Sequence, residues 1–397
     1  MSTTIQRYVP ADARELVEIV QAAVGKTTPL EIVGGGTKRG IGAPCRTTML
    51  VSTERFNQII DYDPSELVLT VGAGAKLGEI EALLASREQM FAFEPFDFAD
   101  MGAESSRRST IGGVVAAGLA GSRRVSAGNV RDHVLGFSAV SGRGEAFIAG
   151  GHVVKNVTGY DLSKLMCGSW GQLAVLTEIT LKVLPRPRVT LTVVADDLDE
   201  VHAFSAMSKA LRSHAAIAAA AYIPRGLIDT CSHTLLRLEG FGPSVGARYK
   251  VLQSLMPTAA LHKLEAAEGN AMWERVCNGA LLGLNSISVR WRVNVPATSG
   301  THLMSILHEW GGKCYADWGG ALVHAQLPIS VVPDELRAAV DRLGGHAMLV
   351  HAPDDYRTKC SALHPERQGV AALTQRVKAA FDPTGILDPL RFADSTA

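Results

Sequence analysis

The sequence predicts a protein of mixed α+β class with two main domains. Up to about residue 185, short apolar runs alternate with glycine clusters and short helical patterns, and no regular βαβ rhythm is evident. The prolines of Pro185-Arg186-Pro187 mark a linker, beyond which the glycine clusters become fewer. A length of 397 residues fits two or three domains. We therefore expect domains at 1–187 and 188–375, with 376–397 as a C-terminal segment that returns toward the first domain.

The elements can be placed by their apolar spacing. Leu16, Ile19, Val20 and Ala23 recur at helical spacing, and Pro10 suits the first turn of that helix. Farther along, the pattern predicts strands at 30–33, 48–51 and 67–71, a turn at 61–64, a helix at 77–84, an alanine-rich helix at 201–221 and a strand at 287–291. The second domain should therefore contain both helices and strands.

Composition excludes several classes of protein. Lysine plus arginine equals aspartate plus glutamate, at 39 each, so nothing favours a nucleic acid or an anionic membrane as partner. The six cysteines contain no C-x-x-C pair, which argues against a zinc site or an iron–sulfur cluster. No signal pattern and no apolar run of roughly 20 residues is present. We expect a cytoplasmic protein without a direct membrane span.

The stretch from Leu30 to Lys38 is the first candidate site. An apolar strand runs into three consecutive glycines, followed by Thr37 and Lys38. Glycine lets the main chain approach a ligand closely, and successive N–H groups in such a turn can form a concave anion site. Taken alone, the triplet is better explained as a surface turn. Two later segments favour the ligand-binding interpretation.

A second glycine-rich turn, at residues 71–78, is a decoy. It lies between a predicted strand and a predicted helix, as a dinucleotide-binding Rossmann turn would. Its glycines stand at 72, 74 and 78, however, and the fingerprint needs the third glycine one position earlier. We expect a structural turn there, without NAD.

The two segments that accompany the first loop are more specific. Residues 109–132 begin with Ser109-Thr110-Ile111-Gly112-Gly113 and continue through small residues, so a helix N-terminus and flank could lie against a phosphate ligand. The alternative is a small-residue helix packed on its neighbour. Residues 155–178 include a glycine turn, Gly168 to Gly171, that feeds a strand.

Together, these three segments resemble the FAD-binding domain of the vanillyl-alcohol oxidase/PCMH flavoprotein superfamily. The narrower resemblance is to GlcE, the family of smaller FAD-binding subunits of glycolate oxidase (glycolate dehydrogenase) complexes. It is carried by 119–124, 130–132, 154–162, 316–321 and 381–386 and covers nearly the whole chain. The resemblance implies a PCMH-type FAD-binding domain of two subdomains, followed by a smaller α+β cap or substrate domain with an antiparallel sheet.

The resemblance also implies which residues bind FAD. The diphosphate loop is Ile32, Val33, Gly34, Gly35, Gly36, Thr37 and Lys38. The segment along the diphosphate and ribityl chain is Arg107, Arg108, Ser109, Thr110, Ile111, Gly112 and Gly113. Small residues beneath the flavin are Ala117, Gly118, Leu119 and Ala120. The adenine side is met by Trp170, Gly171, Gln172, Leu173, Ala174, Val175 and Leu176.

Two departures from the superfamily pattern matter. Members with covalent FAD often carry a histidine in the glycine loop, and Thr37-Lys38 supplies none. We therefore expect non-covalent FAD. Trp170 and Ala174 replace residues that are commonly acidic and glycine, so we expect the local contacts there to differ from those of the wider superfamily.

Catalytic residues are harder to assign. Oxidation of a 2-hydroxy acid by a flavin needs a cation for the carboxylate and a base near the hydroxyl. Related 2-hydroxy-acid dehydrogenases carry H-x-G-D-G-N-x-H and E-H-G metal motifs, which are absent here, so we expect no metal. Lys155, Tyr160 and Asp317 are candidates for lining a flavin-facing cleft, with a purely structural role as the alternative.

The resemblance implies a function in a complex. The chain would be an FAD subunit that takes part in oxidising glycolate to glyoxylate, passing electrons to a larger FAD subunit and an iron–sulfur subunit. Membrane association would come only through such a partner. Alternatively, it is a structural or electron-relay subunit and the larger homologous subunit oxidises the substrate. A stand-alone oxidase of another hydroxy acid or alcohol is the third interpretation.

Overall fold

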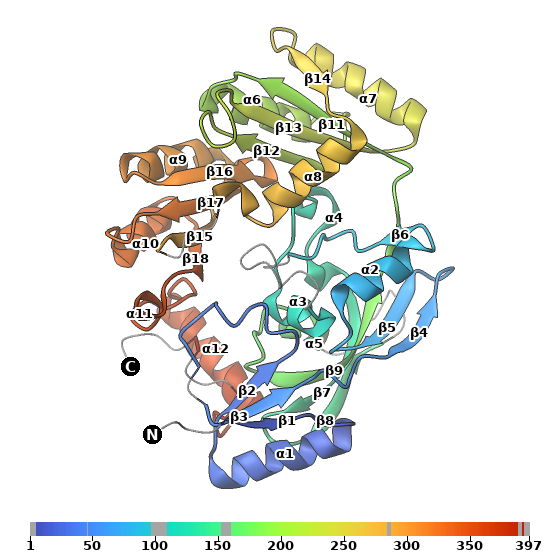
Figure 1. Ribbon diagram of the computed structural model, residues 1–397, viewed down its shortest axis with the longest axis vertical. Coiled ribbons are helices and arrows are strands. Elements are labelled where there is room, and N and C mark those ends of the chain that lie inside the picture. The colour runs from blue at the N-terminus through green and yellow to red at the C-terminus, as the bar shows by residue number, and fades with distance from the viewer. Residues whose placement is uncertain are drawn as a thin grey trace.

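The computed structural model describes residues 5–45, 47–96, 109–151, 160–283, 287–387 and 391–392. Figure 1 shows two lobes, with the sheets of the first half of the chain in one and the sheet formed by residues 189–351 in the other. Helices and antiparallel sheets are mixed throughout, so the predicted α+β class is confirmed. The domain limits at 187 and 375 remain our proposal.

The N-terminal helix packs beside a small parallel sheet. Strands β1 (Gln6–Tyr8), β3 (Met49–Ser52) and β2 (Leu30–Val33) lie in that order, and helix α1 spans Ala13–Lys26. The predicted apolar stripe of α1 is buried. Pro10 precedes the helix instead of lying in its first turn, because the Asp12 side chain accepts hydrogen bonds from the N–H groups of Arg14 and Glu15 and caps the helix there.

A five-stranded sheet forms the centre of this N-terminal lobe. Its order is β4 (Ile59–Asp63), β5 (Val68–Gly72), β9 (Ala174–Lys182), β7 (Val134–Ser141) and β8 (Ala146–Gly150), and every pairing is antiparallel. The turn expected at 61–64 is mostly strand β4, because its residues pair with β5. Helices of the lobe are α2 (Leu77–Ala85), α3 (Ile111–Ala117), α4 (Arg124–Ala127) and α5 (Leu162–Met166), with a 3-10 turn η2 at Val130–Asp132.

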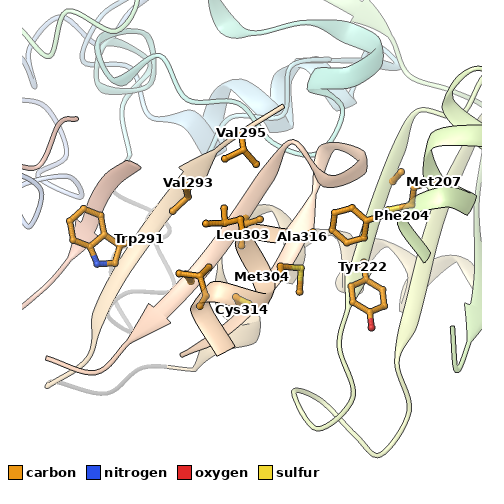
Figure 2. Packing of buried hydrophobic residues seen from close by; sticks show 14 of the residues in the cluster. Phe204, Met207, Tyr222, Trp291, Val293, Val295, Leu303, Met304, Cys314 and Ala316 are labelled. Atoms are coloured by element: carbon orange, nitrogen blue, oxygen red, sulfur yellow. The ribbon is translucent and has the colours of Figure 1, made fainter. Parts of the chain in front are cut away.

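The C-terminal lobe is built on an eight-stranded antiparallel sheet. Its strand order is β14 (Leu261–Lys263), β11 (Val189–Asp196), β13 (His233–Gly240), β12 (Ala219–Ile223), β16 (Lys313–Asp317), β17 (Leu322–Leu327), β15 (Val289–Asn294) and β18 (His346–His351). One apolar face packs against α6 (Glu200–Leu211), α7 (Gly242–Leu255), α9 (Gly300–Glu309) and α10 (Pro333–Arg342). Figure 2 shows part of this core, including Trp291, Val293, Leu303 and Met304. The other face carries α8 (Ala266–Cys277) and η3 (Ala280–Leu282) over its β11–β13–β12 part.

The helix expected over 201–221 is wrong in its second half. Helix α6 ends at Leu211, and Ala219 to Ala221 belong to strand β12. These alanines pair with Arg237, Leu236 and Leu235 of β13 and are fully buried. Sheet packing on both faces therefore overrides the helix preference of alanine.

The two lobes are tied together at several points. Strands β6 (Gln89–Met90) and β10 (Leu184–Pro185) pair at the crossing, and α11 (Asp354–Arg357) and α12 (Gln368–Phe381) lead the chain back (Figure 1). After α12, the N–H of Leu30 donates to the carbonyl of Ile386 at 2.7 Å, so the C-terminal segment lies against β2. Short turns η4 (Ala297–Ser299) and η5 (Trp318–Gly320) complete the C-terminal lobe.

A buried ion-pair network also joins the lobes. Glu94 accepts from Arg123 at 2.8 Å and from Arg237, and Arg123 donates to Glu239 at 2.6 Å. Burial opposes the charge on Glu94, but the two arginines outweigh it and lower the pKa of this carboxyl. The network therefore orients the C-terminal lobe over the segment that contains Glu94 and Arg123.

Candidate functional site

The glycine loop begins where strand β2 ends. Gly36 has a φ of +76°, a conformation that only glycine adopts without strain. Within the described part of the chain, the main-chain N–H groups of Gly34, Gly35, Gly36 and Thr37 donate to no protein acceptor. A run of such donors is a ready site for an anion.

Helix α3 begins directly beside this loop. The Thr110 side chain caps the helix by accepting from the N–H of Gly113 at 3.4 Å, and the Thr37 and Ser109 hydroxyls lie 3.0 Å apart. A Cβ on Gly34 would stand 2.2 Å from Thr110 Oγ1, and one on Gly112 would stand 2.7 Å from the carbonyl oxygen of Ala73. Glycine at 34 and 112 therefore allows the loop, α3 and the end of β5 to meet without a gap.

The third predicted segment packs on the other end of α3. The N–H of Gly168 donates to the Val115 carbonyl at 3.1 Å, and that of Trp170 donates to the Ala116 carbonyl at 2.9 Å. Trp170 itself has a φ of +54°, unusual for a bulky residue, and its ring lies 5.2 Å from that of Phe392. The turn before β9 is thus held against α3 by main-chain hydrogen bonds.

These three segments enclose one pocket, which holds about 780 Å³ of empty space and opens to solvent. Its lining residues are Ile32, Val33, Gly34, Gly35, Gly36, Thr37, Lys38, Arg39, Thr53, Ala73, Thr110, Gly112, Gly113, Ala116, Ala117, Ser169, Trp170, Gly171, Ala174, Leu176 and Arg391. Three of the described lining residues are cationic, and none is Asp or Glu. A pocket with main-chain donors, cationic side chains and apolar walls fits a dinucleotide with a diphosphate, as in FAD.

The pocket brings together most, but not all, of the predicted FAD-binding residues. Ser109 lies beside it, through the contact with Thr37, whereas Ile111 is buried in the core. Gln172, Leu173 and Val175 do not line it, while Gly118, Leu119 and Ala120 line a second pocket between the lobes. Arg107 and Arg108 lie outside the described residues. The assignment of individual FAD contacts remains a prediction.

Sequence reasoning missed several lining residues. Thr53 and Ala73 directly follow strands β3 and β5, so their position at strand ends was a usable signal. Arg391 comes from the far end of the chain and donates to the carbonyls of Lys38 and Ile41. No local pattern around Arg391 indicates that contact.

The catalytic candidates are scattered. Lys155 lies outside the described residues. Tyr160 is 95% exposed and lines none of the described pockets. Asp317 is buried, where it accepts from Ser122 Oγ and from the N–H of Trp318, each at 2.7 Å. Burial raises the pKa of Asp317 to about 6 against those two hydrogen bonds.

The histidines do not gather. Among the described residues, no group of three or more His, Cys, Asp or Glu side chains is placed to hold a metal ion. His324 is buried between the rings of Tyr315 and Phe96, and burial, together with the charges of Arg292 and Arg290, lowers its pKa well below the usual value.

None of the described helices is both long and apolar enough to cross a membrane.

Comparison with known proteins agrees with this geometry. A family model described as "FAD binding domain" matches residues 6–150. The chain is 33% identical to the glycolate oxidase subunit GlcE of Escherichia coli over 379 residues, covering 96% of this chain and 97% of the relative. It is 23% identical to the glycolate oxidase subunit GlcD of Bacillus subtilis, covering 96% and 87%.

Among solved structures, p-cresol methylhydroxylase with substrate bound superposes with a TM-score of 0.71 at 14% identity, covering 97% of this chain and 88% of that one. At this identity the likeness concerns the fold, and it confirms the predicted PCMH-type class.

Proposed function

The chain belongs to the GlcE family of FAD-binding glycolate oxidase subunits, and we propose that it takes part in oxidising glycolate, or a similar 2-hydroxy acid, to glyoxylate. The proposal rests chiefly on one observation, the match to GlcE over nearly the full length of both chains. The site supports it, because the pocket beside Gly34 to Lys38 has main-chain donors and cationic side chains that suit the diphosphate of FAD.

When bound, FAD would supply the hydride acceptor for oxidation of the substrate. The chain's own part is to hold it. Main-chain N–H groups of the glycine loop would bind the diphosphate, and Lys38 and Arg391 would add positive charge to the pocket. No histidine, cysteine or tyrosine is among the described lining residues, which supports non-covalent binding.

In the proposed function, electrons leave through partner subunits. The cysteines are free, and no described group of them could carry an iron–sulfur cluster. We propose that a larger FAD subunit, homologous to this one, and an iron–sulfur subunit complete the complex. The likeness to GlcD supports such a homologous partner.

A second function deserves a direct test, because the H-x-G-D-G-N-x-H motif of related dehydrogenases is missing. In that case the chain is a structural or electron-relay flavin subunit, and the partner oxidises the substrate. The test is anaerobic addition of glycolate to the purified chain, with and without the larger subunit, while flavin absorbance is recorded. Bleaching by glycolate alone supports the oxidising role. Bleaching only with the partner supports the relay role, and vigorous peroxide formation without partners would favour a stand-alone oxidase.

A further inference from the structure

One face of the C-terminal sheet carries a row of polar side chains. In the strand register, Arg292 pairs with His324, while Arg290 pairs with Gln326 and with His351. Because paired residues of neighbouring strands point to the same face, these side chains lie together on β15, β17 and β18. Alternate residues such as Trp291 and Val293 point into the apolar core on the opposite face (Figure 2).

These polar groups are buried and incompletely bonded. Arg290, Arg292 and His324 are 4%, 2% and 3% exposed. Among the described residues, no partner is found for Arg290 Nε and Nη2, Arg292 Nη1, His324 Nε2, Gln326 Oε1 or His351 Nε2. Native structures leave few buried polar atoms unsatisfied, so these groups need water or a ligand as their partner.

The row carries positive charge that no carboxylate of the described residues pairs with. No described Asp or Glu forms an ion pair with Arg290 or Arg292. Burial lowers the pKa of Arg292 to about 10, which leaves the guanidinium charged at neutral pH. The nearby carboxyl of Asp317 instead accepts hydrogen bonds from Ser122 and Trp318. Among the described residues only the nearby Asp317 offsets the charge of Arg292, so an anion bound there would stabilise the buried guanidinium further.

Arg292 is also held firmly in place. Its Nη2 donates to the carbonyl of Ala120 at 2.9 Å, and its guanidinium lies 4.9 Å from the ring centres of both Phe96 and Trp318. The adjoining pocket is lined from the N-terminal lobe by Gly118 to Ala120 and from the C-terminal lobe by Arg292, Asn294 and His346. Arg292 therefore faces the segment expected to lie beneath the flavin.

We propose that this buried face, with Arg290, Arg292, His324 and Gln326, is a binding site for a small carboxylate that carries a hydroxyl group. The planar guanidinium groups suit the carboxylate. Gln326 Oε1 and a ring nitrogen of neutral His324 suit the hydroxyl as acceptors. The inference rests on the proposed function and extends it, because it gives this subunit a substrate site of its own, without a metal.

The test is anaerobic calorimetric titration of the full-length, FAD-containing chain with glycolate, acetate, glycolamide and inorganic phosphate. We expect glycolate to bind at least roughly tenfold more tightly than the other three compounds. Glycolamide lacks the negative charge, acetate lacks the hydroxyl, and phosphate lacks the planar shape of a carboxylate. Arg290→Met and Arg292→Met should each weaken glycolate binding at least roughly tenfold, as expected for loss of a charge-assisted hydrogen bond. Arg225→Met is the matched control, since Arg225 is 68% exposed and pairs with Asp197 at 2.7 Å.

Two further readouts separate the possible failures. The melting temperature of Arg290→Met should equal or exceed that of the parent chain, because the variant removes a buried charge without a partner. Equal binding of glycolate and glycolamide, phosphate binding as tight as glycolate, or unchanged affinity in both variants would overturn the carboxylate site. FAD content is measured on the same samples. Arginine-dependent glycolate binding by a chain that holds no FAD would keep this site and reject the proposed function, whereas bound FAD without arginine dependence would do the reverse.

Discussion

Replacing Gly34 with alanine tests how the glycine loop is packed. Gly34 has an ordinary φ, so alanine causes no backbone strain there. Its Cβ would lie 2.2 Å from Thr110 Oγ1, however, whereas ordinary contacts begin near 3.4 Å. The loop or the start of α3 must therefore move by about 1 Å, which displaces the N–H groups assigned to the diphosphate.

The expected magnitudes follow from this contact. Overpacking of this kind costs about 1–3 kcal/mol in free energy of unfolding. Weakening one charge-assisted hydrogen bond to FAD should raise its Kd at least roughly tenfold. Thr110→Ala removes the clashing oxygen at a cost of about 1 kcal/mol for the lost helix cap. The double variant, Gly34→Ala with Thr110→Ala, should lose less free energy of unfolding than the two single variants lose in sum, by at least about 1 kcal/mol.

Denaturant unfolding and FAD titration of the parent chain, the two single variants and the double variant measure these changes in stability and FAD affinity. Gly78→Ala is the control, because Gly78 lies in helix α2 and a Cβ there meets nothing within 4 Å. It should leave FAD binding unchanged and stabilise the chain by up to about 1 kcal/mol. Parent-like FAD binding and stability in Gly34→Ala, or strict additivity in the double variant, would refute the packing argument.

Two further predictions concern charged groups. Arg39→Met should lower the free energy of unfolding by about 1–3 kcal/mol, because it leaves the carboxylate of Glu31, only 3% exposed, without its bidentate partner at 2.7 Å. The control is Arg7→Met, which breaks the exposed pair with Glu54 and should lose no more than about 1 kcal/mol in denaturant unfolding. Equal losses in the two variants would contradict this ranking. Asp317 has its pKa raised from 3.8 to about 6, so its contribution to stability is present below about pH 4 and is lost as the pH rises through 6. Relative to the parent chain, the free energy of unfolding of Asp317→Asn should therefore rise by on the order of 2 kcal/mol between pH 4 and 7.5. A pH-independent difference between the two proteins would show that Asp317 is ionised at both pH values.

The sequence predicted the loop, the start of α3 and the turn before β9 well, because each depends on glycines at local spacing. Their meeting in one pocket could be inferred only through the family resemblance, since nothing local links Gly34 with Thr110. Arg391 and Thr53 escaped prediction for the same reason. Their contacts depend on distant parts of the chain.

Alanine content misled the assignment of residues 219–221, where burial in the sheet outweighs intrinsic preference. The polar row of Arg290, Arg292 and His324 was not predicted either. Strand alternation can be read from Val289-Arg290-Trp291-Arg292-Val293, but it does not reveal that the arginine face is buried. Arg292 and His324 are covered in part by Phe96 of the N-terminal lobe, a contact that no local pattern indicates.

The most direct test of the central claim is the amount and state of flavin in the purified chain. The chain is denatured, filtered, and the flavin in filtrate and protein fraction is measured by absorbance and identified by chromatography. We predict one FAD per chain, all of it in the filtrate, because main-chain donors and cationic side chains hold it without a covalent bond. Purified chain that holds no flavin and takes up none when FAD is added, or flavin that stays attached to the denatured polypeptide, would contradict this claim.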